Sequence, residues 1–352
     1  ICMWTRPNIR ADLGREAMTL MGSRPKQMRA VRLSALHEDV VEAIRILRVV
    51  EQPVPEPRRG QVLVKIEAAP CNPSDLLLLQ GKYGVSKSLP TVPGWEGAGQ
   101  VVASGGGWLA GWRKNKRVAC GVQADRDGTW AEYCLANATD CIPLKRQMEI
   151  EKAASLIVNP LTAIGLLDTA QRSGHRAAVQ TAGASQLGRM LIDLAARANY
   201  PIICVVRREN QVQLLKSLGA QLVLDSSHPN FVEQLTKACQ QVNATAAFEA
   251  VAGDMTGTLL NVLPRGGCVY VYGALSEEPC SNIDPIDLIF REKMITGFYL
   301  GSWVKRRGVL GVLRAANRLQ SMLIDGLIET SVQRRVDLDE VVDGLEQYAQ
   351  NM

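Results

Sequence analysis

A strand, a glycine turn and a helix follow one another in the stretch Ala177-Ala178-Val179-Gln180-Thr181-Ala182-Gly183-Ala184-Ser185-Gln186-Leu187-Gly188. Gly183 and Gly188 occupy the first and last glycine positions of a G-x-G-x-x-G turn, and Ser185 stands at the middle one. Such a turn presents the free N–H groups of a helix N-terminus to a dinucleotide pyrophosphate. A degenerate glycine pattern alone is weak evidence, but the strand–turn–helix context favours a cofactor site over a structural turn.

Strands and helices alternate around this turn. Apolar strands are predicted at 201–206, 222–225, 245–250 and 267–272, with helices at 185–198 and 209–218 among them. This alternation predicts an α/β fold with a doubly wound parallel sheet over residues 150–290. After about Phe290 we expect the chain to leave that sheet. Residues 28–149 instead show short alternating strands separated by Gly and Pro, which is typical of a β-rich, Greek-key or barrel-like domain.

The strand at 201–206 ends in Arg207, Arg208 and Glu209. An acidic residue at this place accepts a hydrogen bond from the ribose of NAD, whereas two guanidinium groups suit the 2′-phosphate of NADPH. The alternative is that both arginines are solvated residues at a helix start. We therefore expect NADPH as the cofactor.

Composition and charge narrow the class of protein. The 352 residues include 47% hydrophobic and 21% charged residues, with a net charge of +5, which is typical of a globular chain. Residues 1–27 hold much of the basic excess, so we expect no nucleic-acid partner. We read this segment as a leader or targeting remnant and leave it out of the fold prediction.

No apolar run approaches the ~18 residues of a membrane span. Nine cysteines without a C-x-x-C pair predict reduced, mostly buried thiols of an intracellular protein.

Four separated motifs carry a resemblance to a known family. They are Asn72-Pro73-Ser74-Asp75, Gln80-Gly81-Lys82-Tyr83-Gly84, Asn159-Pro160-Leu161-Thr162-Ala163, and Leu288-Ile289-Phe290-Arg291 followed by Gly297 to Trp303. With the glycine turn, they resemble the zinc-free medium-chain dehydrogenase/reductases, and within these the mitochondrial 2-enoyl thioester reductases. The resemblance implies a GroES-like catalytic domain at 28–149 and 291–352 around the Rossmann domain at 150–290.

The same resemblance implies a function. It is the NADPH-dependent reduction of trans-2-enoyl-CoA or enoyl-ACP in fatty acid synthesis, in a mitochondrial homodimer that contacts acyl carrier protein. A quinone or enone reductase on the same fold is the alternative within enzymes, and a non-catalytic NADPH-binding protein is the alternative outside them. A cytoplasmic location is also open.

The resemblance further implies site residues. Tyr83 matches the catalytic acid of the family. A phenol with a pKa of about 10 is protonated at neutral pH and can therefore donate a proton. Trp303 matches an aromatic residue that lines the active site. Each has a structural alternative, a solvated loop tyrosine and a core tryptophan. The implied cofactor-binding residues are Asn159, Gly183, Ala184, Ser185, Gln186, Leu187, Gly188, Arg207, Arg208, Glu209, Tyr272, Gly273, Ala274, Leu275, Phe298, Tyr299, Leu300 and Gly301.

Two departures from the wider family bear on the chemistry. Asn72 and Trp95 stand where zinc-dependent relatives have zinc ligands, and the three histidines show no ligand spacing, so we expect no metal. Relatives also continue into a final strand with a cofactor-contacting lysine, whereas this sequence ends at Met352, so we expect either that its C-terminus is truncated or that this contact is absent.

Overall fold

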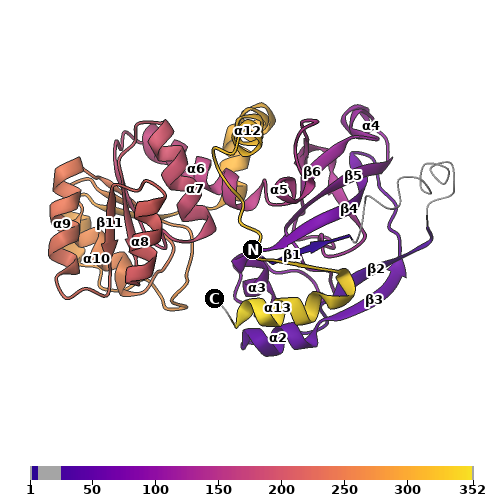
Figure 1. Ribbon diagram of the computed structural model, residues 1–352, viewed down its shortest axis with the longest axis horizontal. Coiled ribbons are helices and arrows are strands. Elements are labelled where there is room, and N and C mark those ends of the chain that lie inside the picture. Colours follow the sequence, from indigo (N-terminus) through magenta and orange to yellow (C-terminus); the bar gives the residue numbers. More distant parts are fainter. Residues whose placement is uncertain (1, 7–24, 351–352) are drawn as a thin grey trace. The chain divides into compact units, whose positions relative to one another are not determined.

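The computed structural model describes residues 2–6 and 25–350, which form two compact units (Figure 1). The first contains residues up to Val158 and from Ala316 onward, and the second runs from Asn159 to Ala315. We expected the divisions after residues 149 and 290. They lie further along because helix α5 (Ile150–Ala154) packs on strands of the first unit, and strand β14 (Met294–Gly297) extends the sheet of the second.

Six parallel strands form the sheet of the second unit, in the order β11-β10-β9-β12-β13-β14. Along β10, Ile203 and Val205 join an apolar cluster on one face, and Cys204 and Val206 join another on the opposite face. Helices therefore cover both faces, which confirms the predicted doubly wound sheet. The strands are β9 (Ala178–Gln180), β10 (Ile202–Val206), β11 (Leu222–Asp225), β12 (Ala246–Glu249), β13 (Cys268–Val271) and β14.

The helices of this unit fill the connections between its strands. The chain does not leave the sheet after Phe290, because β14 pairs in parallel with β13. Helix α12 (Leu300–Ile324) is interrupted at Gly308, where φ is 65° and the backbone is not helical. The other helices are α6 (Val158–Arg172), α7 (Gln186–Arg197), α8 (Glu209–Ser217), α9 (Phe231–Val242), α10 (Asp254–Val262) and α11 (Pro285–Ile289).

The first unit is β-rich, as predicted. Its main sheet runs β15-β1-β4-β5-β6-β8, with β7 also paired to β4, and a separate hairpin joins β2 to β3. The strands are β1 (Cys2–Thr5), β2 (Gln27–Arg32), β3 (Arg48–Pro53), β4 (Gln61–Cys71), β5 (Glu96–Ser104), β6 (Arg117–Gly121), β7 (Tyr133–Asn137), β8 (Cys141–Pro143) and β15 (Arg334–Val336). Besides α5 and the end of α12, its helices are α2 (Val40–Ile46), α3 (Pro73–Leu79), α4 (Trp108–Arg113), α13 (Val341–Ala349) and the 3₁₀ turns η1 (Ala138–Asp140) and η2 (Leu338–Glu340).

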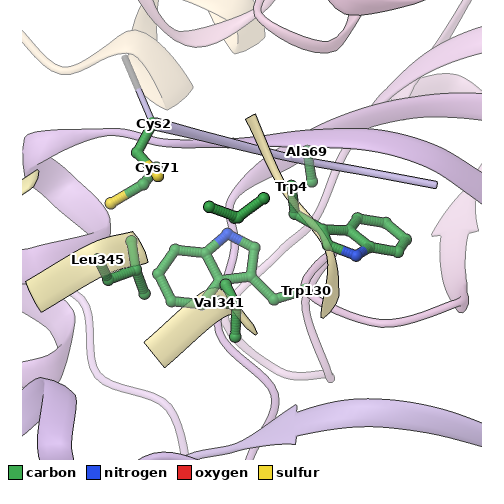
Figure 2. Close-up of a pocket in the computed structure, with 8 residues that line it drawn as sticks. Cys2, Trp4, Ala69, Cys71, Trp130, Val341 and Leu345 are labelled. Atoms are coloured by element: carbon green, nitrogen blue, oxygen red, sulfur yellow. The ribbon is translucent and has the colours of Figure 1, made fainter. Parts of the chain in front are cut away.

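Strand β1 comes from the segment that the sequence prediction left out. Cys2 lies opposite Cys71 of β4 and Arg334 of β15, so β1 is an interior strand of the sheet. Trp4 is only 3% exposed, and it lines a small apolar pocket with Trp130 and Leu345 (Figure 2). Residues 2–5 are thus part of the fold of the first unit; residues 7–24 lie outside the described residues.

All nine cysteines are free thiols, and only Cys280 is exposed. This confirms the predicted buried thiols, whose apolar surroundings raise the pKa of several, Cys204 to about 11. Among the described residues, no helix combines the length and the apolar character that crossing a bilayer requires.

Candidate functional site

The carboxyl ends of the parallel strands bring the predicted cofactor segments to one edge of the second unit. The strand order reverses between β9 and β12, and ligands of doubly wound sheets bind at such a reversal. The segments that follow these strands are Gly183 to Gly188 after β9, Arg207 to Glu209 after β10, Tyr272 to Leu275 after β13, and Phe298 to Gly301 after β14. Asn159 stands apart from them, in the first turn of α6.

The glycine turn after β9 is built for a close approach of helix and strand. Ser185 is the N-cap of α7, and its hydroxyl accepts a hydrogen bond of 3.0 Å from the Gly188 N–H. A Cβ at Gly188 would lie 2.4 Å from the Gly183 carbonyl oxygen, so only glycine fits there. The left-handed residue of the turn is Ala182, with φ of 50°, which comes just before Gly183.

Arg207 and Arg208 follow β10 as exposed residues, and Arg208 is the N-cap of α8. Neither guanidinium group forms an ion pair with a carboxylate of the described residues. Two uncompensated cations at a strand end suit a ligand phosphate.

Sequence reasoning missed a buried polar group beside these segments. The carboxylate of Glu249, at the end of β12, accepts hydrogen bonds from the Thr181 hydroxyl at 3.3 Å and from the backbone N–H of Ala252 at 2.9 Å. Burial raises its pKa, and its second oxygen, like the hydroxyl of Tyr272, has no hydrogen-bond partner in the part of the chain that the structure describes. A glutamate ending an otherwise apolar strand was the signal available in the sequence.

A cofactor fits this edge on its own geometry. A Cβ at Gly273 would lie 2.8 Å from the Ala250 carbonyl oxygen, so this position has no room for a side chain. Within residues 2–6 and 25–350, the buried Tyr272 hydroxyl and the second oxygen of Glu249 have no hydrogen-bond partner, as groups that face a polar ligand would. Together with Arg207 and Arg208, they suit a phosphorylated dinucleotide.

Trp303 lies deep in the second unit. It is 2% exposed, its indole N–H donates to the Asp168 carboxylate over 3.1 Å, and that carboxylate also pairs with Arg307. A Cβ at Gly165 would lie 2.6 Å from the ring of Phe298 and 3.2 Å from that of Trp303. The indole N–H is therefore engaged, and Trp303 and Phe298 hold the start of α12 against α6.

Tyr83 lies in the first unit, in the loop after α3. Its backbone N–H donates to the Leu77 carbonyl, and its ring lies 5.1 Å from that of Trp95, centroid to centroid, at 43°. Lys87 places its ammonium 4.9 Å from the Trp95 ring. Tyr83 and Lys87 also line a pocket with Leu33, Leu36, Leu78 and Leu89. A phenol therefore stands next to an apolar pocket that holds one buried cation.

Trp95 and Lys87 are further residues that the sequence did not single out as neighbours of Tyr83. The Lys87 ammonium donates to the carbonyl oxygens of Arg126 and Gln123, at 2.5 and 3.5 Å. Burial lowers its pKa to about 8, against the opposing effect of nearby carboxylates such as Asp127.

A buried network of hydrogen bonds holds the backbone of Trp95, the residue that contacts Tyr83. Asn72 donates its side-chain N–H to Glu96 over 2.9 Å, and Asp75 accepts from the backbone N–H groups of Asn72 and Trp95. Glu96 also accepts from the N–H groups of Ile157 and Val158. The amide of Asn72 thus stands where zinc-dependent relatives have a zinc ligand. Among the described residues, no three His, Cys, Asp or Glu side chains form a group that could bind a metal.

The two carboxyls of this network make stability depend on pH. Burial raises the pKa of Asp75 and of Glu96 to about 7, whereas both lie near 4 in an unfolded chain. The folded state therefore binds more protons between these values, and its stability should fall by about 1–2 kcal/mol per carboxyl from pH 5 to pH 7. Urea unfolding across this range tests the slope. Glu96→Gln should flatten it, and an unchanged slope would contradict the assignment.

Comparisons with known proteins agree with this geometry. A family model for the alcohol dehydrogenase GroES-like domain matches residues 58–146, and a model for zinc-binding dehydrogenase matches 187–315. The mitochondrial enoyl-[acyl-carrier-protein] reductase of Homo sapiens is 33% identical over 254 residues, 70% of this chain and 67% of the relative.

Two solved structures share the whole fold. A protein from Mesorhizobium loti, assigned as an NADPH:quinone reductase, superposes with a TM-score of 0.86 at 33% identity, covering 93% of this chain and 97% of the other. A mycobacterial protein in complex with NADPH superposes with a TM-score of 0.76 at 25% identity, covering 92% and 96%.

Proposed function

Because the chain belongs to the medium-chain dehydrogenase/reductase family and is an oxidoreductase, we propose that it reduces the C2=C3 double bond of trans-2-enoyl thioesters with NADPH. The observation that carries this proposal is the Tyr83 phenol, which contacts the tilted ring of Trp95 and lines the apolar pocket. Enoyl-CoA or enoyl-ACP is the substrate, with an acidic carrier protein as the second partner. The relatives' names support a mitochondrial setting in fatty acid synthesis.

The proposed chemistry assigns separate roles to the cofactor and to Tyr83. NADPH, when bound, supplies the hydride for the β carbon. Tyr83 donates a proton toward the α carbon or hydrogen-bonds the thioester oxygen as charge builds on it. Trp95 orients the phenol by ring contact, and the Asp75 carboxylate fixes Trp95 through its backbone N–H. Asn159, the glycine turn and the segments after β13 and β14 hold the cofactor.

The second candidate is a quinone reductase, which the likeness to the Mesorhizobium loti protein favours. NADPH oxidation measured side by side with crotonyl-CoA, a long-chain enoyl-CoA and a quinone separates the two. Turnover of both thioesters in preference to the quinone supports the proposal. Turnover of the quinone alone contradicts it.

Cofactor choice rests on Arg207 and Arg208, whose guanidinium groups have no carboxylate partner among the described residues. Loss of a charge-assisted phosphate contact costs about 1.5–3 kcal/mol, or about ten- to a hundredfold. We expect Arg207→Ala/Arg208→Ala to raise the KM for NADPH by that factor and to leave that for NADH nearly unchanged. Steady-state kinetics with both cofactors measures this. Equal losses for both would show that the pair does not bind the 2′-phosphate.

A homodimer is the proposed assembly, and the exposed edge of the second unit's sheet supports it. Strand β14 ends the sheet, and beside it Ile289, Phe290 and Met294 are 65%, 64% and 54% exposed. An open strand edge next to apolar side chains is suited to pairing with a second copy.

We expect Phe290→Asp/Met294→Asp to convert the dimer to a monomer in light scattering coupled to size-exclusion chromatography. Val232→Asp, at a 53% exposed position on α9, is the matched control and should leave the mass unchanged. A dimer that survives the double substitution would place the interface elsewhere.

A further inference from the structure

Two tryptophans stand exposed on the short helix α4. Trp108 is 84% exposed and Trp112 is 49% exposed, and their spacing of four residues puts them on the same side of the helix. Ala110 and Arg113, both 1% exposed, anchor the other side against the protein. Helix α4 packs on β4, β5 and η1, and it lies at an outer end of the first unit's sheet (Figure 1). Exposed indoles gathered on one face are a sign of an interaction surface.

Four basic residues surround the two tryptophans. The Lys116 ammonium lies 3.1 Å from the centroid of the Trp112 ring, and exposed Lys114 caps the end of α4. Exposed Arg58 and Arg59 belong to the neighbouring loop, whose Gly60 N–H donates to the Gly106 carbonyl over 2.9 Å. We call Arg58, Arg59, Trp108, Trp112, Lys114 and Lys116 the α4 surface.

Negative charge near this surface is sparse. None of its four cations forms an ion pair with a carboxylate of the described residues. Asp140 of the adjacent η1 turn is occupied by the side-chain amides of Gln123 and Asn137, and exposed Glu56 is the nearest acid in sequence to Arg58. The surface thus keeps a net positive charge available to an external partner.

We propose that the α4 surface docks the protein on anionic phospholipid membranes. Tryptophan prefers the headgroup region of a bilayer, where its ring is buried and its N–H stays hydrated. Each arginine or lysine near the tryptophans raises the affinity of the protein for an anionic leaflet about fivefold. A partner protein would bury the indoles in a pocket of its own, whereas two exposed indoles on one side of a helix beside four cations suit a lipid surface. This inference is independent of the proposed reaction.

Flotation of the full chain with vesicles of phosphatidylcholine and phosphatidylglycerol in equal amounts tests the proposal. We expect binding to these vesicles and little to pure phosphatidylcholine, with a blue shift of tryptophan fluorescence. Trp4, Trp130 and Trp303 are already buried and Trp95 is half-buried, so the shift is assigned to α4 by its loss when Trp108 and Trp112 are replaced. Equal binding to both vesicle types, or none, would overturn the proposal.

Two variants separate the contributions. Trp108→Ser/Trp112→Ser should weaken vesicle binding about tenfold and abolish the shift, and Arg58→Ser/Arg59→Ser/Lys114→Ser about a hundredfold, at fivefold per cation. Val232→Ser, an exposed apolar position on α9, should bind like wild type. Thermal unfolding of each variant checks the fold. Full binding by the tryptophan variant, or capture by acidic carrier protein in place of vesicles, would contradict membrane docking.

Discussion

Tyr83→Phe should lower kcat on enoyl thioesters by about 10²–10⁴-fold, the range of general acid catalysis. The substitution removes one oxygen and keeps the ring, so the contact with Trp95 at 5.1 Å persists. The loss should fall on kcat, with the KM for NADPH preserved, because the hydroxyl acts in the transition state. Stopped-flow measurement of NADPH oxidation under single-turnover conditions gives the rate of the chemical step.

A residual rate is expected, since water can deliver the proton in place of the phenol. Lys82→Met, an exposed neighbour in the same loop, is the control and should stay near wild type. If Tyr83→Phe remains within about threefold of wild type on every thioester, Tyr83 has no part in the chemistry. The quinone reductase assignment would then become the stronger one.

Trp4→Ala should destabilise the first unit by about 3–5 kcal/mol, the cost of removing a buried aromatic side chain. Trp4 is 3% exposed and packs beside Trp130 and Val336 in an interior strand. Trp4 already lines a small apolar pocket, so removal of its ring enlarges a cavity. The midpoint of urea unfolding, followed by circular dichroism, measures the loss.

Two control substitutions test whether the loss of stability comes from the buried ring of Trp4. Trp4→Phe keeps most of the apolar volume and removes an indole N–H that has no partner among the described residues, so it should cost about 1 kcal/mol or less. Trp108→Ala, at an 84% exposed position, should cost little. A Trp4→Ala protein as stable as wild type would show that β1 does not pack in solution as described.

The periodicity of the sequence predicted the second unit well because both faces of its sheet are covered. Buried parallel strands such as β10 show in the sequence as short apolar runs, and the glycine turn is recognised from the spacing of a few neighbouring residues. Ser185 caps α7 and Gly188 lies close to the Gly183 carbonyl, and both features depend on neighbours only a few residues away.

Long-range pairing was not predictable in the same way. Nothing local in Cys2-Met3-Trp4-Thr5 indicates that it pairs with β15, more than three hundred residues later. β14 was missed because its residues are mostly exposed at a sheet edge and lack an apolar run. The placement of Trp95 and Lys87 beside Tyr83 likewise depends on the tertiary fold, as does the hydrogen bond from the Thr181 hydroxyl to Glu249.

The position of β1 has a consequence for synthesis on the ribosome. β1 can pair with β4 once residue 71 has emerged, but its other neighbour, β15, ends at Val336. At about 5–20 residues per second, the interval between the two lasts from about ten seconds to nearly a minute. During that time the nascent first unit carries an open strand edge, while the second unit is completed. Nascent-chain protection by a chaperone should therefore be most important for this protein before its last strand emerges.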